Sequence, residues 1–133
     1  MRTMKKLFLN GPYSFSLDEH KMSNVGNLVD ARRQLFSRIN ENNNLNYLLK
    51  KRYSWMNKFF KPNDVIVEIG CGTGASEFFL TTKPILTDVM ANDWVDMVLD
   101  ANQMNLPDNS VDIFIASHNI HHFSSPAKFF YEC

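Results

Sequence analysis

Residues 65–75 limit the fold more than any other part of the chain. They read Val-Ile-Val-Glu-Ile-Gly-Cys-Gly-Thr-Gly-Ala, an apolar run that leads directly into glycines at positions 70, 72 and 74. Glycine adopts positive φ without steric cost and lets a ligand approach the backbone closely. A helix opening at residues 75–77 would add free backbone N–H groups at its N-terminus. The stretch therefore predicts a strand, a ligand-binding turn and a helix in succession.

Three further short apolar runs follow this turn, at residues 85–87, 97–99 and 111–116. Near-continuous hydrophobicity in short runs is typical of parallel strands that are covered on both faces. The segments between the runs are long enough for crossover connections. We therefore expect an α/β fold with a doubly wound, mostly parallel sheet.

The first sixty residues have a different pattern. Apolar residues recur at helical spacing over residues 28–39 and again over 45–60, with a run rich in Asn between them. We expect residues 1–62 to form an N-terminal helical cap. Phe59 and Phe60 lie at helical spacing and are expected in its core.

Charge is distributed unevenly along a chain that is neutral overall. Residues 1–61 hold 12 Lys and Arg against 4 Asp and Glu, whereas residues 62–133 hold 2 against 10. Residues 62–82 contain no Lys or Arg. An acidic surrounding of the glycine turn suits a cationic ligand better than a phosphate-rich one. It would also repel a phosphate backbone, so nucleic acid is not expected as a partner.

From its cysteine usage we expect the chain to be cytoplasmic. Cys71 and Cys133 are too few for a disulfide framework and have no metal-ligand spacing. The apolar run at residues 7–9 is too short for an export signal. No window approaches the roughly 20 apolar residues of a membrane span. We expect neither a metal site nor contact with a membrane.

Two classes of ligand fit the glycine turn. The spacing Gly70-x-Gly72-x-x-Ala75 satisfies the loose fingerprint of dinucleotide sites, so an NAD(P)-binding oxidoreductase is an alternative. Glu68-x-Gly70-x-Gly72-x-Gly74 matches the nucleotide-loop motif of class I S-adenosylmethionine-dependent methyltransferases, which this chain resembles. Glu68 favours the second class, because a sulfonium-bearing zwitterion tolerates or uses a nearby carboxylate.

Further segments match this family in the same order along the chain, over about residues 65–133. Asp88 ends the second expected strand, where a carboxylate can accept hydrogen bonds from ribose hydroxyls. Asp100 and Ala101 resemble the family's aspartate that binds the adenine amino group and the small residue after it. Residues 103–112 resemble the approach to the fourth strand, although the usual aromatic residue is missing.

The resemblance implies a Rossmann-like core at residues 63–133 that binds S-adenosylmethionine as cofactor. The methionyl part would contact Glu68 and the glycines, the ribose Asp88, and the adenine Asp100. The complete set of expected cofactor-binding residues is Glu68, Gly70, Cys71, Gly72, Gly74, Asp88, Val89, Asp100, Ala101 and Ser117.

The segment after the fourth expected strand contains three histidines. In the resembled family this strand end faces the transferred methyl group. His122 is the candidate general base or substrate orienter, since imidazole titrates near neutral pH, although a packing role fits it equally well. A metal cluster with His118 and His121 is not expected, because three histidines on one loop would diverge and lack a Cys or acidic partner at ligand spacing.

The expected activity is direct methyl transfer to a small-molecule acceptor. The Asn/Asp-Pro-Pro-Tyr/Phe motif of relatives that methylate amino groups of nucleic acids and proteins is absent, and Ser117-His118-Asn119-Ile120 stands in its place. Alignment and desolvation supply most of the catalysis of such a displacement. The N-terminal helices, with Tyr13, would cap the acceptor pocket.

The resembled fold has seven strands, and only strands one to four can be placed here, so the rest are expected to be missing. Strand four would then expose an apolar edge, which is a site for pairing with another chain. We expect a truncated piece of a longer protein, or a half that pairs with another chain in an oligomer. A non-catalytic, cofactor-binding fragment is therefore a second alternative function.

Overall fold

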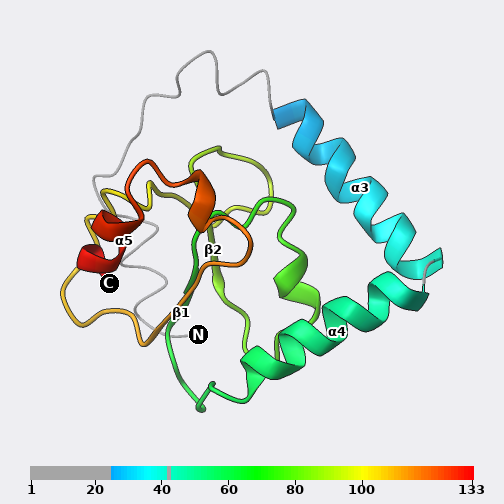
Figure 1. The fold of residues 1–133 in the computed structure, drawn as a ribbon, viewed down its shortest axis with the longest axis horizontal. Coiled ribbons are helices and arrows are strands. Elements are labelled where there is room, and N and C mark those ends of the chain that lie inside the picture. The colour runs from blue at the N-terminus through cyan, green and yellow to red at the C-terminus, as the bar shows by residue number, and fades with distance from the viewer. Residues whose placement is uncertain (1–24, 42) are drawn as a thin grey trace.

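The computed structural model describes residues 25–41 and 43–133. Expectations for residues 1–24, including the role of Tyr13, lie outside this part of the chain. No helix in the described ranges is long and apolar enough to cross a membrane. The main elements, drawn in Figure 1, are α3 (Val25–Glu41), α4 (Asn43–Asn57), β1 (Ile66–Glu68), β2 (Ile85–Asp88), β3 (Met97–Val98), β4 (Ile113–Ile115) and α5 (Pro126–Glu132).

The four strands form one parallel sheet in the order β3-β2-β1-β4. β1 is central, and its Val67 lies opposite Ile85 of β2 on one side and Phe114 of β4 on the other. After β3 the chain crosses to the far side of β1 to form β4. Such a switch point opens a crevice at the carboxyl ends of the strands. The predicted doubly wound, Rossmann-like α/β fold with N-terminal helices is confirmed.

Side chains of β1 alternate between two hydrophobic cores, one on each face of the sheet. Ile66 packs with Leu49 and Tyr53 of α4. Val67 belongs to the other core, which includes Phe129 of α5. Figure 1 shows α4 and α5 on opposite sides of the strands. Because both faces are covered, the strands carry continuous apolar runs, as their sequence predicts.

The connections between strands contain less helix than a doubly wound sheet usually has. The glycine turn leads into one short 3-10 helix, η1 (Ala75–Phe78). The β2–β3 and β3–β4 connections, both described throughout, have turns and no helix. In the β3–β4 connection, which is the longer of the two, Asn105 and Asn109 adopt positive φ, a backbone conformation that interrupts a helix.

Helix α4 ends earlier than the sequence predicts, at Asn57. The Asn57 side chain accepts a hydrogen bond from the Thr81 backbone N–H (3.0 Å) and donates one to the Phe79 carbonyl (3.2 Å). The chain then turns, so only Phe60 packs against the core. Phe59 is 58% exposed, and the prediction that it belongs to the core is wrong.

Candidate functional site

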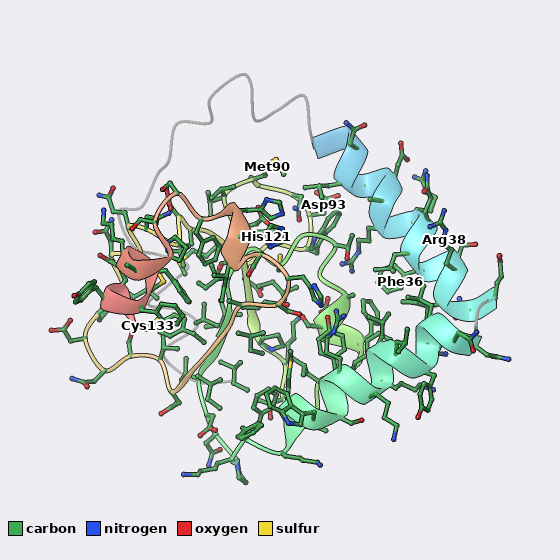
Figure 2. The ribbon with its side chains drawn as sticks, viewed as in Figure 1. Phe36, Arg38, Met90, Asp93, His121 and Cys133 are labelled. Atoms are coloured by element: carbon green, nitrogen blue, oxygen red, sulfur yellow. The ribbon has the colours of Figure 1, made fainter. Side chains whose placement is uncertain are left out.

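A pocket of about 420 Å³ lies at the carboxyl ends of the strands. Its wall includes residues that end or follow each strand: Gly70 after β1, Asp88 at the end of β2, Asp100 after β3 and Asn119 after β4. Figure 2 shows Met90, which also lines it, and the neighbouring His121 at the same end of the sheet. Ligands of parallel α/β sheets bind in this place, so the pocket is the candidate functional site.

The glycine turn has left-handed backbone at all three glycines, with φ of +61° at Gly70, +52° at Gly72 and +65° at Gly74. A Cβ placed on Gly72 would meet no atom within 4 Å among the residues described. Packing within the fold therefore does not require glycine there. The left-handed conformation requires it, and the open space in front of the backbone is available to a ligand.

Asp88 holds the glycine turn against the end of β2. Its Oδ2 accepts a hydrogen bond from the Gly72 N–H (2.9 Å), and its Oδ1 accepts one from the Met90 N–H (3.1 Å). The side chain is buried, at 6% relative exposure, and lines the pocket. Asp88, the residue predicted to bind the ribose, therefore lies in the pocket wall and also holds the glycine turn in place.

The residues predicted at the adenine end lie in the same pocket. Asp100 is exposed, and its Oδ1 accepts hydrogen bonds from the backbone N–H (2.8 Å) and the side-chain amide (3.2 Å) of Asn102. Ala101 is buried beside it, and Val89, which follows β2, is exposed. The structure thus brings five predicted cofactor residues together: Gly70, Asp88, Val89, Asp100 and Ala101.

The other five predicted cofactor residues, Glu68, Cys71, Gly72, Gly74 and Ser117, are not in the wall of this pocket.

Glu68 lies beneath η1. It is 4% exposed, and its Oε2 accepts a hydrogen bond from the Ser76 hydroxyl. Burial raises the pKa of Glu68 from 4.5 to about 7, the Ser76 hydrogen bond acts in the opposite direction, and the negative charge of Asp88 raises it further. In this structure Glu68 anchors the short helix rather than facing the pocket.

Cys71 is a buried residue of the turn. Its backbone N–H donates to the Thr87 carbonyl (2.9 Å). Burial, followed by the charges of Asp88 and Glu68, raises the pKa of the Cys71 thiol well above its usual range. The thiolate is therefore disfavoured, and Cys71 is a small packing residue rather than a nucleophile.

Asn119, which the sequence analysis did not select, ties the loop after β4 to the glycine turn. Its Nδ2 donates to the carbonyls of Ile69 and Gly70, the second at 3.2 Å. A Cβ on Gly70 would lie only 2.6 Å from this nitrogen. The buried Oδ1 has no hydrogen-bond partner within the described part of the chain. Its position after the strand that neighbours β1 is the signal that could have identified it.

Arg32 of α3 also reaches the turn and was missed. Its Nη1 donates to the Thr73 carbonyl, and its guanidinium carbon lies 4.6 Å from the centroid of the Trp94 ring. The Trp94 Nε1 in turn donates to the Gly72 carbonyl (2.7 Å). A cation from a distant helix thus lies against the turn, in addition to the acidic residues that the sequence places around it.

His122 lines the pocket from η2 (Ile120–His122), and its side chain is exposed. The His121 ring lies beside it, with 3.9 Å between the ring centroids. His118 has positive φ at the start of the same loop. Among the described residues, no group of three or more His, Cys, Asp or Glu could hold a metal ion.

Comparison with known families matches the part of the chain that builds this site. The model of a methyltransferase domain family matches residues 67–133, half of the chain, from within β1 to the end of α5. Neither the curated proteins nor the solved structures gave a match. The family match, the parallel sheet and the glycine turn agree, and the chain belongs to a class I S-adenosylmethionine-dependent methyltransferase family.

Proposed function

We propose that this chain binds S-adenosylmethionine in the pocket at the strand ends and transfers its methyl group to a small-molecule acceptor. One observation carries the proposal: the five residues Gly70, Asp88, Val89, Asp100 and Ala101, assigned to the cofactor from the family resemblance, line one pocket. They come from the ends of three different strands, so their convergence depends on the fold.

The hydrogen-bond acceptors and the volume of the pocket fit this cofactor. The volume of the pocket lies in the range of about 300–1,000 Å³ that is typical of small-molecule sites. Each carboxylate oxygen can accept more than one hydrogen bond, so Asp88 can receive ribose hydroxyls while it holds the Gly72 and Met90 N–H groups. The open space in front of Gly72 leaves room for the amino-acid end.

When bound, S-adenosylmethionine supplies an electrophilic methyl group on its sulfonium. The chain contributes alignment and exclusion of water, which lower the barrier of a displacement between two held reactants. His122 lies at the pocket and can take a proton from an acceptor that must lose one. Phe123, the next residue, packs against Phe129 with ring centroids 5.1 Å apart and so anchors the loop that carries His122.

Methyl transfer is tested with S-adenosylmethionine labelled in the methyl group and a panel of small phenols, amines and thiols, with protein and nucleic-acid fractions as parallel acceptors. We expect label in the small-molecule fraction only. Label confined to protein or nucleic acid would contradict the acceptor class, and no transfer to any fraction would support a non-catalytic role.

Titration with NADH, followed by its fluorescence, distinguishes the dinucleotide alternative. We expect no saturable binding, because the family match is to methyltransferases and Asp100 after β3 resembles their adenine-binding aspartate. Asp88 does not separate the two classes, since a carboxylate at the end of the second strand binds ribose in NAD sites as well. Saturable NADH binding, without binding of S-adenosylhomocysteine, would overturn the proposal.

A further inference from the structure

We propose that Arg32 is a positioning residue for the cofactor. Together with Trp94 it fixes the two carbonyl groups in the middle of the glycine turn and so sets the orientation of the backbone that receives the amino-acid end of the ligand. The inference rests on the function proposed above and extends it to a residue in α3, outside the segment that matches the family.

The contacts of Arg32 converge on the turn and on η1. Its Nη1 donates to the Thr73 carbonyl, and its Nη2 lies 3.8 Å from a carboxylate oxygen of Glu77 in η1. The guanidinium carbon lies 5.0 Å from the ring centroid of Phe36 and 5.5 Å from that of Phe78. With its side chain only 19% exposed, Arg32 is held in one place by charge and by aromatic rings.

Phe36 helps to bring the helix to the turn. It lies one helical turn after Arg32 on α3 and packs edge-on against Phe78 of η1, with ring centroids 4.6 Å apart. Figure 2 shows Phe36 directed from α3 towards the rest of the fold. The placement of Arg32 therefore has apolar support beyond its own polar contacts.

Trp94 completes the arrangement from the β2–β3 connection. Its ring lies under the guanidinium, and its Nε1 donates to the Gly72 carbonyl at 2.7 Å. A Cβ on Gly74 would come within 2.7 Å of both Arg32 Nη1 and Trp94 Cδ1. The two side chains thus lie in direct contact with the turn, and glycine at position 74 leaves the space they occupy.

The consequence for ligand binding follows from the planarity of the peptide group. Trp94 fixes the Gly72 carbonyl, so the N–H of Thr73 on the same trans peptide must point the opposite way, away from Trp94. Asp88 fixes the Gly72 N–H, and the Cys71 carbonyl accepts the Gly74 N–H at 2.8 Å. Each peptide group from 71 to 74 is held before a ligand arrives, which reduces the entropy lost on binding.

This role predicts that the two ends of the ligand respond differently to a change at Arg32. The turn would receive the amino-acid end, whereas the Asp88, Asp100 and Ala101 wall would receive the adenosyl end. S-adenosylhomocysteine has both ends, and 5′-methylthioadenosine lacks the amino-acid end. We therefore expect Arg32→Gln to weaken S-adenosylhomocysteine about tenfold, as loss of a charged hydrogen bond does, and to change methylthioadenosine affinity less than about twofold.

Calorimetric titration of both ligands with the full chain makes the comparison. Arg33→Gln is the matched control, since Arg33 is the next residue of α3 and its mostly exposed side chain pairs with Asp30 (2.9 Å). Arg32→Lys keeps the charge but loses the planar surface against Trp94, and its affinity should lie between those of the wild type and the Gln variant. Equal losses for both ligands, or an equal loss in Arg33→Gln, would overturn the inference.

A second measurement needs no ligand. Hydrogen exchange at the Gly74 amide of the free chain should speed up in Arg32→Gln and in the ring-conserving Trp94→Phe, and remain unchanged in Arg33→Gln. Unchanged exchange in the first two variants would overturn the positioning role by itself. If exchange responds as expected but the wild type binds neither adenosyl ligand, the proposed function is contradicted. The conclusion that Arg32 and Trp94 fix the backbone of the turn would then still be supported.

Discussion

The side-chain nitrogen of Asn119 lies directly against Gly70. It donates to the Gly70 carbonyl at 3.2 Å, and a Cβ on Gly70 would come within 2.6 Å of it. The two residues are 49 positions apart, so this contact joins the loop after β4 to the turn after β1. The two residues thereby form a joined part of the pocket wall at the ends of two neighbouring strands.

Gly70→Ala is expected to lower the free energy of unfolding by more than 2 kcal/mol. Alanine costs roughly 1–3 kcal/mol at positive φ, and its Cβ would also overlap the Asn119 amide. Gly72→Ala is the matched control, because its φ is also positive but its Cβ would meet no described atom within 4 Å. Urea denaturation of both variants measures the difference, and equal losses would show that the contact with Asn119 has no energetic weight.

Asn119→Asp should be more destabilising than Asn119→Ala, although aspartate is closer to asparagine in shape. Alanine removes the hydrogen bonds to the Ile69 and Gly70 carbonyls, at about 1 kcal/mol each. Aspartate replaces the donor nitrogen with a charged oxygen that faces two carbonyl oxygens, which is repulsive. Thermal denaturation at neutral pH ranks the variants, and a more stable Asp variant would refute the assigned direction of these hydrogen bonds.

Glu68 predicts a specific dependence of stability on pH. Burial raises its pKa from 4.5 to about 7, so between these values the folded chain binds a proton that the unfolded chain has released. The stability that this group contributes is fully present below about pH 4.5 and is lost as pH rises to about 7. The expected loss is on the order of 3 kcal/mol.

The side chain introduced by Glu68→Gln cannot ionise, so this variant should lack the pH-dependent contribution of Glu68 to the free energy of unfolding. Urea denaturation of the wild type and the variant at pH 5 and pH 8 isolates it, because other titrating groups are common to both. We expect the wild type to lose stability relative to the variant as pH rises. A constant difference between the two proteins would rule out proton binding at Glu68.

His122→Ala should lower kcat by about 10²-fold or more with an acceptor that loses a proton on methylation, and should leave the affinity for S-adenosylhomocysteine nearly unchanged. His121→Ala, which removes the neighbouring ring, is the control. Equal effects of the two substitutions would assign both histidines to loop packing.

The parts of the fold predicted from sequence are those that depend on neighbours along the chain. The four strands are recognisable because burial on both faces forces continuous apolar runs, and the glycine turn because positive φ selects glycine. The sequence correctly predicts Asp88 at the end of β2 and Asp100 shortly after β3, because each carboxylate interrupts a short apolar run.

The parts that escaped prediction depend on partners distant in sequence. Arg32 contacts Thr73 across 41 residues, and no local pattern distinguishes it from Arg33. The direction of the Glu68 side chain could not be predicted for another reason. Glu68 lies on the same face of β1 as Ile66, and that face packs against α4 rather than lining the pocket. The absence of helices from the β2–β3 and β3–β4 connections could not be predicted either, because the length of a segment does not show whether it forms a helix or a series of turns.

Calorimetric titration of the chain with S-adenosylhomocysteine shows whether the pocket at the strand ends holds the adenosyl cofactor. We predict saturable binding to the wild type, a loss of about tenfold or more in Asp88→Ala, and no change in Asp93→Ala, an exposed aspartate of the same connection. No binding to the wild type, or equal affinity in Asp88→Ala, would show that this pocket is not the cofactor site.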